Sequence, residues 1–223
     1  MWDSTSAPSE EALSRPAGSP APVHLPIFPL PAVLFPGATV PLHIFEPRYR
    51  EMVGRCLEHD EPFGVVLIQE GEEVGGHAAP RRIGTEARVI ASQRYRDGRY
   101  DIVAEGRRRF EILQLDRSRA YLRADVEWLE ELEGRDVHRL AETVATLFEG
   151  VLESLELAGQ AIVDESWKAL DPRSLSYRVA AALPADDLVK QELLEAADVA
   201  SRLVREAELL MSVARIGAEA GAA

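Results

Sequence analysis

Several features that define large classes of proteins are scarce in this chain of 223 residues. It has one cysteine, Cys56, so no intrachain disulfide can form. No run approaches the roughly 18 consecutive apolar residues of a membrane-spanning helix. The N-terminus lacks the cationic start and apolar run of a secretory signal. These absences favour a cytoplasmic location and predict no membrane association.

Catalytic motifs are equally scarce. The sequence contains no Gly-x-x-x-x-Gly-Lys-Ser/Thr loop for phosphates and no Gly-x-Ser-x-Gly nucleophile elbow. A Ser-Lys dyad would have to use Lys168 or Lys190, which are the only lysines. Ser166 lies two residues from Lys168, a spacing that places them on different faces of a helix. The five histidines show no zinc-binding spacing. We therefore expect no enzymatic activity, no cofactor and no metal site.

One weak catalytic candidate is the pair Cys56 and His59, three residues apart on a predicted helix, which resembles a nucleophile with its base. Cys56, however, shares the apolar stripe of that helix with Met52 and Val53. Because cysteine is among the most buried residue types, a structural role is favoured. An unrecognised enzyme remains open, and it would require a pocket in which titratable groups converge.

The net charge of −13 disfavours general binding to nucleic acid or to anionic membranes. Residues 81–109 are the exception, with nine arginines against four acidic residues. A basic hairpin that binds RNA or an acidic partner would use Arg94, Arg96 and Arg99. Cross-strand pairs between arginines and carboxylates on a polar sheet face explain the same composition. We favour the second interpretation and expect nucleic acid not to be a partner.

Residues 25–49 are the most unusual stretch, with large apolar residues between Pro26, Pro29, Pro31, Pro36 and Pro41, and a sixth proline, Pro47. Since proline fixes φ and removes a backbone donor, we expect short extended pieces rather than a helix or a central strand. Pro36-Gly37 fits a type II turn. Most of these apolar residues should be core. Beside the prolines, Leu30, Val33 and Phe35 are the candidates for contact with an extended polypeptide.

The periodicity predicts an α+β chain. Residues 1–23 are expected to be a disordered tail, and 24–132 a β-rich subdomain with about six strands and one inserted helix that begins at Pro47. Its clearest hairpin joins 88–95 to 99–104 through Asp97-Gly98 in a type I′ turn, and Gly106 is expected to turn the chain again. At Glu130 the period changes to 3.6, which predicts a helical subdomain over 133–217. Residues 218–223 are expected to be a flexible tail.

Several segments together resemble the N-terminal substrate-binding domain of Lon proteases. They are Leu25-Pro-Ile-Phe-Pro-Leu-Pro, Val33-Leu-Phe-Pro-Gly37, the segment from Gly84 to Ile90, Gly106-Arg-Arg-Arg-Phe110 and Tyr121-Leu. The resemblance implies a PUA-like twisted β-barrel or sandwich followed by a helical bundle. In full-length Lon proteases this region helps to recognise unfolded or tagged substrates, supports hexamer assembly and precedes ATPase and peptidase modules.

The resemblance implies a stand-alone, bacterial-type, non-catalytic module of protein quality control. It would bind unfolded or damaged polypeptides, or present them to a protease or chaperone. The alternative is a PUA-like nucleic-acid-binding module that uses the arginine-rich hairpin. The oligomeric state is open.

Overall fold

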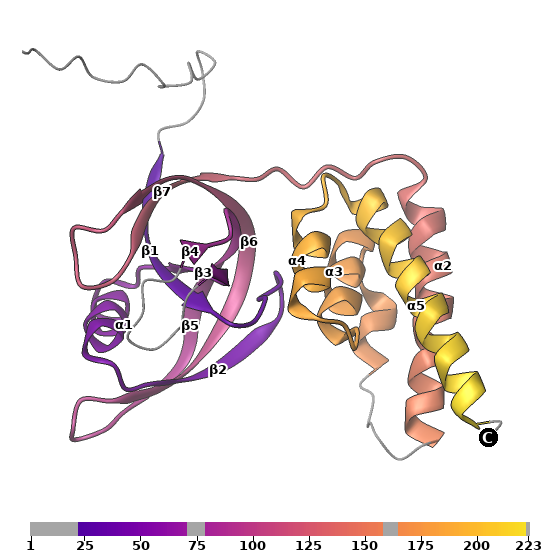
Figure 1. Cartoon of the computed structure of the whole chain (residues 1–223), viewed down its shortest axis with the longest axis horizontal. Coiled ribbons are helices and arrows are strands. Elements are labelled where there is room, and N and C mark those ends of the chain that lie inside the picture. Colours follow the sequence, from indigo (N-terminus) through magenta and orange to yellow (C-terminus); the bar gives the residue numbers. More distant parts are fainter. Residues whose placement is uncertain (1–21, 71–78, 158–164, 222–223) are drawn as a thin grey trace, which may run out of the picture.

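The computed structural model describes residues 22–70, 79–157 and 165–221. They form a curled sheet with one helix and, beside it, a helical bundle, joined by an extended segment after the last strand (Figure 1). This arrangement confirms the predicted α+β fold with a helical bundle after the β-rich part. The strands are β1 Val23–Leu30, β2 Thr39–Ile44, β3 Phe63–Glu70, β4 Ala79–Pro80, β5 Ile83–Arg94, β6 Tyr100–Asp116 and β7 Arg123–Trp128. The helices are α1 Pro47–His59, α2 Val137–Leu157, η1 Glu165–Ala169 (a 3-10 helix), α3 Pro172–Ala182, α4 Asp187–Glu195 and α5 Val199–Gly221.

The proline-rich strand β1 bridges the two ends of the sheet. Its first half, Val23–Pro26, pairs antiparallel with β7, and its second half, Ile27–Leu30, pairs parallel with β3. β1 is therefore less peripheral than its prolines predict. Each half of β1 pairs mainly with one neighbouring strand. A proline in β1 can therefore point its missing N–H to the side on which no strand needs a hydrogen-bond donor. The next turn is confirmed: Gly37 has φ +78° and the Ala38 N–H donates to the Phe35 carbonyl.

Two sequence predictions about the long hairpin are wrong. The type I′ turn needs positive φ at two residues, but only Gly98 has one (+86°), and its N–H donates to the Tyr95 carbonyl. The Asp97 carboxylate accepts from the Arg99 N–H, which stabilises a three-residue loop instead. Gly106 does not turn the chain, because β6 continues through it. A Cβ there would lie 2.4 Å from the Phe35 carbonyl oxygen, so glycine permits a close approach of two backbone segments.

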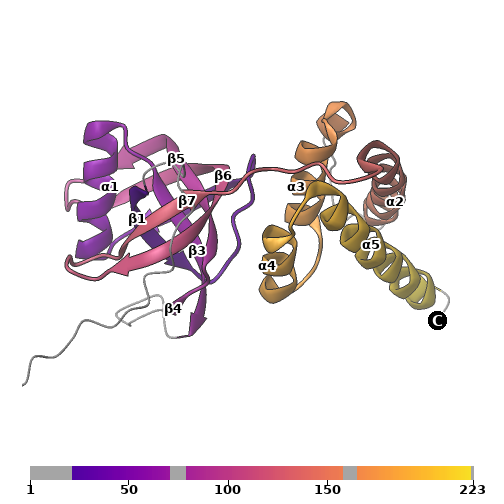
Figure 2. The ribbon, with the colours of Figure 1, turned by 90° about the horizontal axis from the view of Figure 1, so that it is seen from above.

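In the helical part, α2 and α5 lie side by side, and α3 and α4 stand between them and the sheet (Figures 1 and 2). Aspartates cap the N-termini of α3 and α5: Asp171 accepts from Ser174 N–H and Asp198 from Ser201 N–H. The predicted tail at 218–223 is wrong for 218–221, since α5 continues to Gly221 through an alanine-rich segment of high helix propensity. Most of the predicted tail at 1–23, residues 1–21, and residues 222–223 lie outside the described residues.

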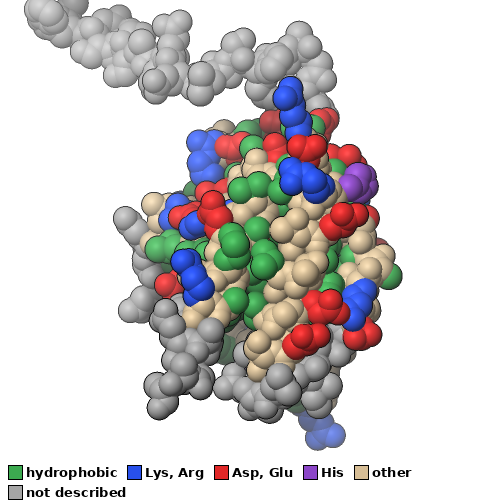
Figure 3. Space-filling model, turned by 90° about the vertical axis from the view of Figure 1, so that its right-hand side faces the viewer, with side chains coloured by type: hydrophobic (Ala, Val, Ile, Leu, Met, Phe, Trp, Pro, Cys, Tyr) green, Lys and Arg blue, Asp and Glu red, His purple; other side chains and the backbone are tan. Residues whose placement is uncertain are grey.

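The outer side of the bundle is formed by α2 and α5. Figure 3 shows hydrophobic side chains in the middle of this side, with charged side chains around them. On α5, Val204 and Met211 are the large apolar residues that are most exposed. None of the helices that the structure describes is both long enough and apolar enough to cross a bilayer.

Candidate functional site

The sheet and the bundle meet at a buried ion pair. Arg109 of β6 is 2% exposed, and its Nε donates to Glu131 Oε1 at 2.7 Å. Its Nη1 donates to the carbonyl oxygens of Leu194 and Ala196, at 2.6 and 2.8 Å, where α4 ends. These carbonyls have no partner within the helix, so Arg109 caps α4 from the neighbouring sheet. One arginine thereby fixes the bundle to β6.

A second buried arginine completes the junction from the other side. Arg202 of α5 is fully buried and stacks over the Tyr177 ring, 3.9 Å from its centroid. Its guanidinium donates to Ser176 Oγ and to the Tyr177 hydroxyl oxygen, at 2.9 and 3.1 Å. The Tyr177 hydroxyl donates to Glu131 Oε1 at 2.5 Å. Glu131 thus receives hydrogen bonds from residues of both parts of the molecule.

These contacts set the charge of Glu131 and Tyr177. Burial alone would raise the pKa of Glu131, but the hydrogen bonds from Tyr177 and Arg109 outweigh it, and the pKa is lowered. Burial is also the largest cause that raises the pKa of Tyr177. At neutral pH the junction therefore holds an ionised carboxylate and a neutral phenol.

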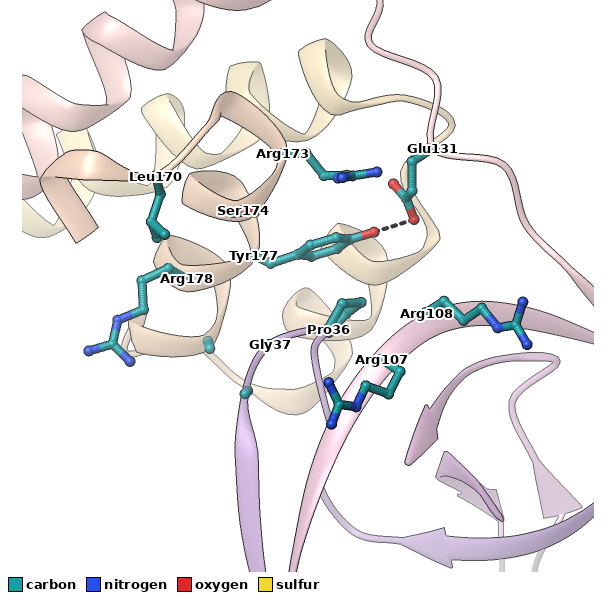
Figure 4. Close-up of a pocket in the computed structure, with 12 residues that line it drawn as sticks. Pro36, Gly37, Arg107, Arg108, Glu131, Leu170, Arg173, Ser174, Tyr177 and Arg178 are labelled. Atoms are coloured by element: carbon teal, nitrogen blue, oxygen red, sulfur yellow. Dashed lines mark hydrogen bonds between the residues drawn. The ribbon is translucent and has the colours of Figure 1, made fainter. Parts of the chain in front are cut away.

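A cleft of about 420 Å³ opens beside this junction (Figure 4). One wall comes from the Pro36-Gly37 turn and β6, and the other from α3 and Leu170, which precedes it. The apolar part of the lining is Pro36, Ala38, Leu170 and Ala181, and the polar part includes Arg107, Arg108, Glu131, Arg173, Ser174, Tyr177 and Arg178. Its volume falls in the range of about 300–1,000 Å³ that ligand pockets occupy.

The arginines of the cleft are not equivalent. Arg108 pairs with Glu86 at 2.6 Å and stacks over Trp128 at 3.6 Å, and it points away from the cleft in Figure 4. Arg107 pairs with Glu105 at 2.8 Å. The side chains of Arg173 and Arg178 form no ion pair with any described residue. In Figure 4, Arg173 extends toward Glu131, whereas Arg178 extends in a different direction, away from Arg173.

The polar groups of the lining are four guanidinium groups, one carboxylate, one hydroxyl and one phenol. The lining includes no cysteine or histidine, and its one serine, Ser174, donates its hydroxyl to the Asp171 carboxylate that caps α3. Within the described residues, no group of three or more His, Cys, Asp or Glu side chains could hold a metal ion. The chemistry of the cleft is that of binding an anionic or amphipathic ligand.

A family model for the substrate-binding domain of the ATP-dependent protease La (Lon) matches residues 24–212. The chain belongs to this family of Lon substrate-binding domains. It is 28% identical over 194 residues to the Lon protease of Anaeromyxobacter dehalogenans, and 28% identical over 189 residues to that of Escherichia coli K12. These alignments cover 85% and 81% of the chain but only 23% and 24% of the two relatives.

Solved structures agree with the Lon assignment. A Lon N-terminal domain protein from Xanthomonas campestris is 30% identical, with a TM-score of 0.60, over 82% of this chain and 96% of that one. The N-terminal domain of the Lon protease of the Mycobacterium avium complex has a TM-score of 0.68, over 85% of this chain and 98% of that one. Its 21% identity supports the likeness in fold alone.

The structure places the three apolar residues that were candidates for polypeptide contact inside the Lon-type fold. Leu30 and Phe35 are 5% and 1% exposed, and Val33 is half-buried. Phe35 and Val33 belong to the core of the helical bundle, where the Phe35 ring packs near Tyr177 with 6.3 Å between centroids. A ligand at the surface would not reach Leu30 or Phe35 in this conformation. The Pro36-Gly37 turn, directly after Phe35, is exposed to solvent at Gly37.

The three candidate arginines of the hairpin are exposed but not alike. Arg99 pairs with Asp97 at 2.8 Å, and the Arg94 guanidinium lies 5.6 Å from the centroid of the Tyr100 ring. Arg96 has no charged partner in the part of the chain that the structure describes. Elsewhere in 81–109, Arg82, Arg88, Arg107, Arg108 and Arg109 each pair with a carboxylate. Paired charges on the sheet surface thus account for most of this basic segment.

Cys56 and His59 do not form a catalytic pair. Cys56 is 3% exposed, and burial raises the pKa of its thiol to about 12, so it stays protonated at neutral pH. The His59 ring nitrogen Nδ1 lies 3.0 Å from the Arg55 carbonyl oxygen, one helical turn back. The predicted structural role of Cys56 fits this environment.

Sequence reasoning missed Glu131, Tyr177, Arg173 and Arg178. One local signal pointed to Arg173. Asp171-Pro172 marks a helix start, and a positive charge in the first helical turn opposes the helix dipole. The Asp171 carboxylate at the cap offsets part of this unfavourable interaction, so the signal is weak. The other three residues meet only through tertiary structure.

Proposed function

We propose that this chain is a non-catalytic polypeptide-binding module of protein quality control, which binds unfolded or damaged chains for a partner protease or chaperone. Membership of the Lon substrate-binding domain family supports the ligand class. A cytoplasmic location is part of the proposal, since the single cysteine cannot form an intrachain disulfide.

The observation that carries the proposal is the cleft between the sheet and α3. Its wall of Pro36, Ala38, Leu170 and Ala181 can cover apolar side chains of a ligand. Leu170 is 40% exposed, so part of this apolar surface is uncovered in the isolated chain. An unfolded polypeptide exposes such side chains, whereas a folded one buries them. Discrimination between the two states would therefore follow from the composition of the cleft.

The alternative of nucleic-acid binding by the hairpin has less support. Of the three candidate residues only Arg96 lacks an interaction with the described chain. Neutralising many phosphates requires several free cations, and the overall charge of −13 opposes a polyanion.

The test compares one protein in two states. Fluorescently labelled, reduced and carboxymethylated α-lactalbumin serves as the unfolded ligand, and the native calcium-bound protein as the folded one. We expect saturable binding of the unfolded form and at least tenfold weaker binding of the native form by fluorescence anisotropy.

Substitution then locates the site. Ala181→Trp fills the cleft and should abolish binding of the unfolded form. Ala120→Trp, on an exposed loop residue of the β-rich part, is the matched control and should leave it unchanged. Equal affinity for both forms of the ligand, or no binding of either, contradicts the proposed function.

A further inference from the structure

We propose that the cleft recognises a carboxylate of the bound polypeptide through Arg173 of α3, with Arg178 and Arg107 at the edges of the cleft adding to its positive field. The inference rests on the proposed function and specifies the ligand. It requires that the cleft be electropositive, that its arginines be available, and that a single carboxylate suit it better than a polyanion.

The charge around the cleft is positive within an acidic protein. The lining has four arginines and one carboxylate. Counting also the ion-pair partners of these residues gives six arginines against three carboxylates. The arginines are Arg107, Arg108, Arg109, Arg173, Arg178 and Arg202, and the carboxylates are Glu86, Glu105 and Glu131. Asp171, whose carboxylate accepts from Ser174 of the lining, reduces this excess of three positive charges to two. In a chain of net charge −13, such a local excess attracts an anion to this place.

The carboxylate of the lining cannot supply that anion. Glu131 accepts from Tyr177 and Arg109 and lies 3.5 Å from Arg202 Nη2, so it is already committed to the buried junction. In Figure 4, Arg173 extends across the cleft toward Glu131, but no ion pair forms between them. The Arg173 guanidinium is therefore positioned over the cleft with free donors.

The donors come from both walls. Arg173 and Arg178 are exposed residues of α3 that form no ion pair with the described chain. Arg107 uses Nη2 for Glu105, and its side chain is still 47% exposed. Guanidinium groups are planar donors that match a carboxylate in two-point geometry. A carboxylate entering the cleft would then lie beside Pro36 and Leu170, which can cover the neighbouring apolar side chain.

A single carboxylate fits these features better than a nucleotide or polyphosphate. The lining has no lysine, and its only aromatic ring, Tyr177, is buried beneath Arg202 and cannot stack on a base. The acidic remainder of the protein repels a long polyanion, whereas one carboxylate experiences mainly the local field.

The carboxylate has two sources, an Asp or Glu side chain and the C-terminus of a chain. The experiment uses four labelled octapeptides with the same alanine, leucine and serine background. One is neutral with an amidated C-terminus, one is amidated with a central Asp, one is neutral with a free C-terminal carboxylate, and one is amidated with a central Lys. Affinities are measured by anisotropy at about 50 mM and 300 mM salt.

We expect at least one carboxylate peptide to bind about tenfold more tightly than the neutral peptide, and the Lys peptide to bind more weakly than neutral. The preference should shrink at high salt. The Arg173→Gln/Arg178→Gln double variant should reduce the preference, taken as the ratio of its own affinities for the carboxylate and neutral peptides, to less than twofold. Arg88→Gln, a partly exposed arginine on β5, should retain the full preference.

The outcome also assigns the source, since preference for central Asp indicates side chains and preference for the free terminus indicates chain ends. Equal affinity for neutral and carboxylate peptides overturns the inference while leaving the proposed function intact. A preference that survives in the double variant overturns it too. If neither the peptides nor unfolded α-lactalbumin bind, both proposals fail.

Discussion

Arg109 and Glu131 form a buried ion pair at 2.7 Å that joins β6 to the segment leading into the helical bundle. Removing one partner of a buried pair leaves an uncompensated charge, which costs about 3–5 kcal/mol. We therefore expect Arg109→Ala to lower the free energy of unfolding by this amount in urea denaturation. Arg88→Ala, whose partner Asp60 is 97% exposed, should cost less than about 1 kcal/mol. Equal costs for the two variants would contradict the role of Arg109.

Phe35 contributes apolar contacts to the same junction between the sheet and the bundle. The residue follows β1 but is buried in the core of the bundle. Phe35→Ala should destabilise the protein by about 3–5 kcal/mol, because it leaves a cavity between the sheet and α3. Phe45→Ala, at a residue that is 48% exposed, should cost less than about 1 kcal/mol. Thermal unfolding followed by circular dichroism measures both, and a mild effect at Phe35 would show that the two parts are not held together there.

Gly106 and Gly150 give opposite predictions for one substitution. A Cβ at Gly106 would lie 2.4 Å from a backbone oxygen, whereas at Gly150 in α2 it would meet nothing within 4 Å. Gly106→Ala should cost about 1–3 kcal/mol through overpacking. Gly150→Ala should gain about 0.5–1 kcal/mol, since alanine is the better helix former. Shifts of the same sign in urea midpoints would contradict this account of Gly106.

Glu206 predicts a dependence of stability on pH. It is fully buried, neither carboxylate oxygen has a hydrogen-bond partner among the described residues, and burial raises its pKa well above 4.5, against the opposing effect of Arg202. A raised pKa in the folded state means that the native protein binds the proton more tightly than the unfolded chain. The stabilising contribution is therefore complete below about pH 4.5 and is lost as the pH rises through the raised pKa of the folded state.

Glu206→Gln removes this titration. The variant should be more stable than the parent at pH 7, by about 1–3 kcal/mol, and nearly equal to it at pH 4. Glu208→Gln is the matched control, because Glu208 is exposed on the same helix and its change should not vary with pH in this way. Urea unfolding at several pH values tests the difference, and a gain at pH 4 as large as that at pH 7 would refute the assignment.

The features that sequence predicted well are local. Helix α1 begins at Pro47 as predicted, and Pro36-Gly37 forms its turn within four residues. Local chemistry of this kind is readable because the chain brings the partners together itself. The order of motifs over residues 23–216 likewise sufficed to recognise the Lon family.

The features that sequence missed depend on distant contacts. Glycine is common in turns, and Gly106 was therefore predicted to turn the chain. Its role is instead set by the close approach of the Phe35 carbonyl, seventy-one residues earlier in the chain. Arg109 contacts carbonyls 85 and 87 residues away. The cleft combines a turn near residue 37, β6 and α3, and nothing in the spacing of these segments predicts that they face one another. Leu30 and Phe35 were predicted to be exposed apolar surface, but Leu30 is buried in the core that the sheet forms with α1, and Phe35 in the core of the bundle.

The central claim is that unfolded polypeptide binds in the cleft between the sheet and α3. Mapping amide chemical shifts of the labelled chain during titration with an unfolded ligand tests it most directly. The account predicts that the largest perturbations fall on residues 37–38, 107–108, 170–171 and 173–181. Perturbations confined to the hairpin around Arg96, or to the outer side of α2 and α5, with the cleft unchanged, would contradict it.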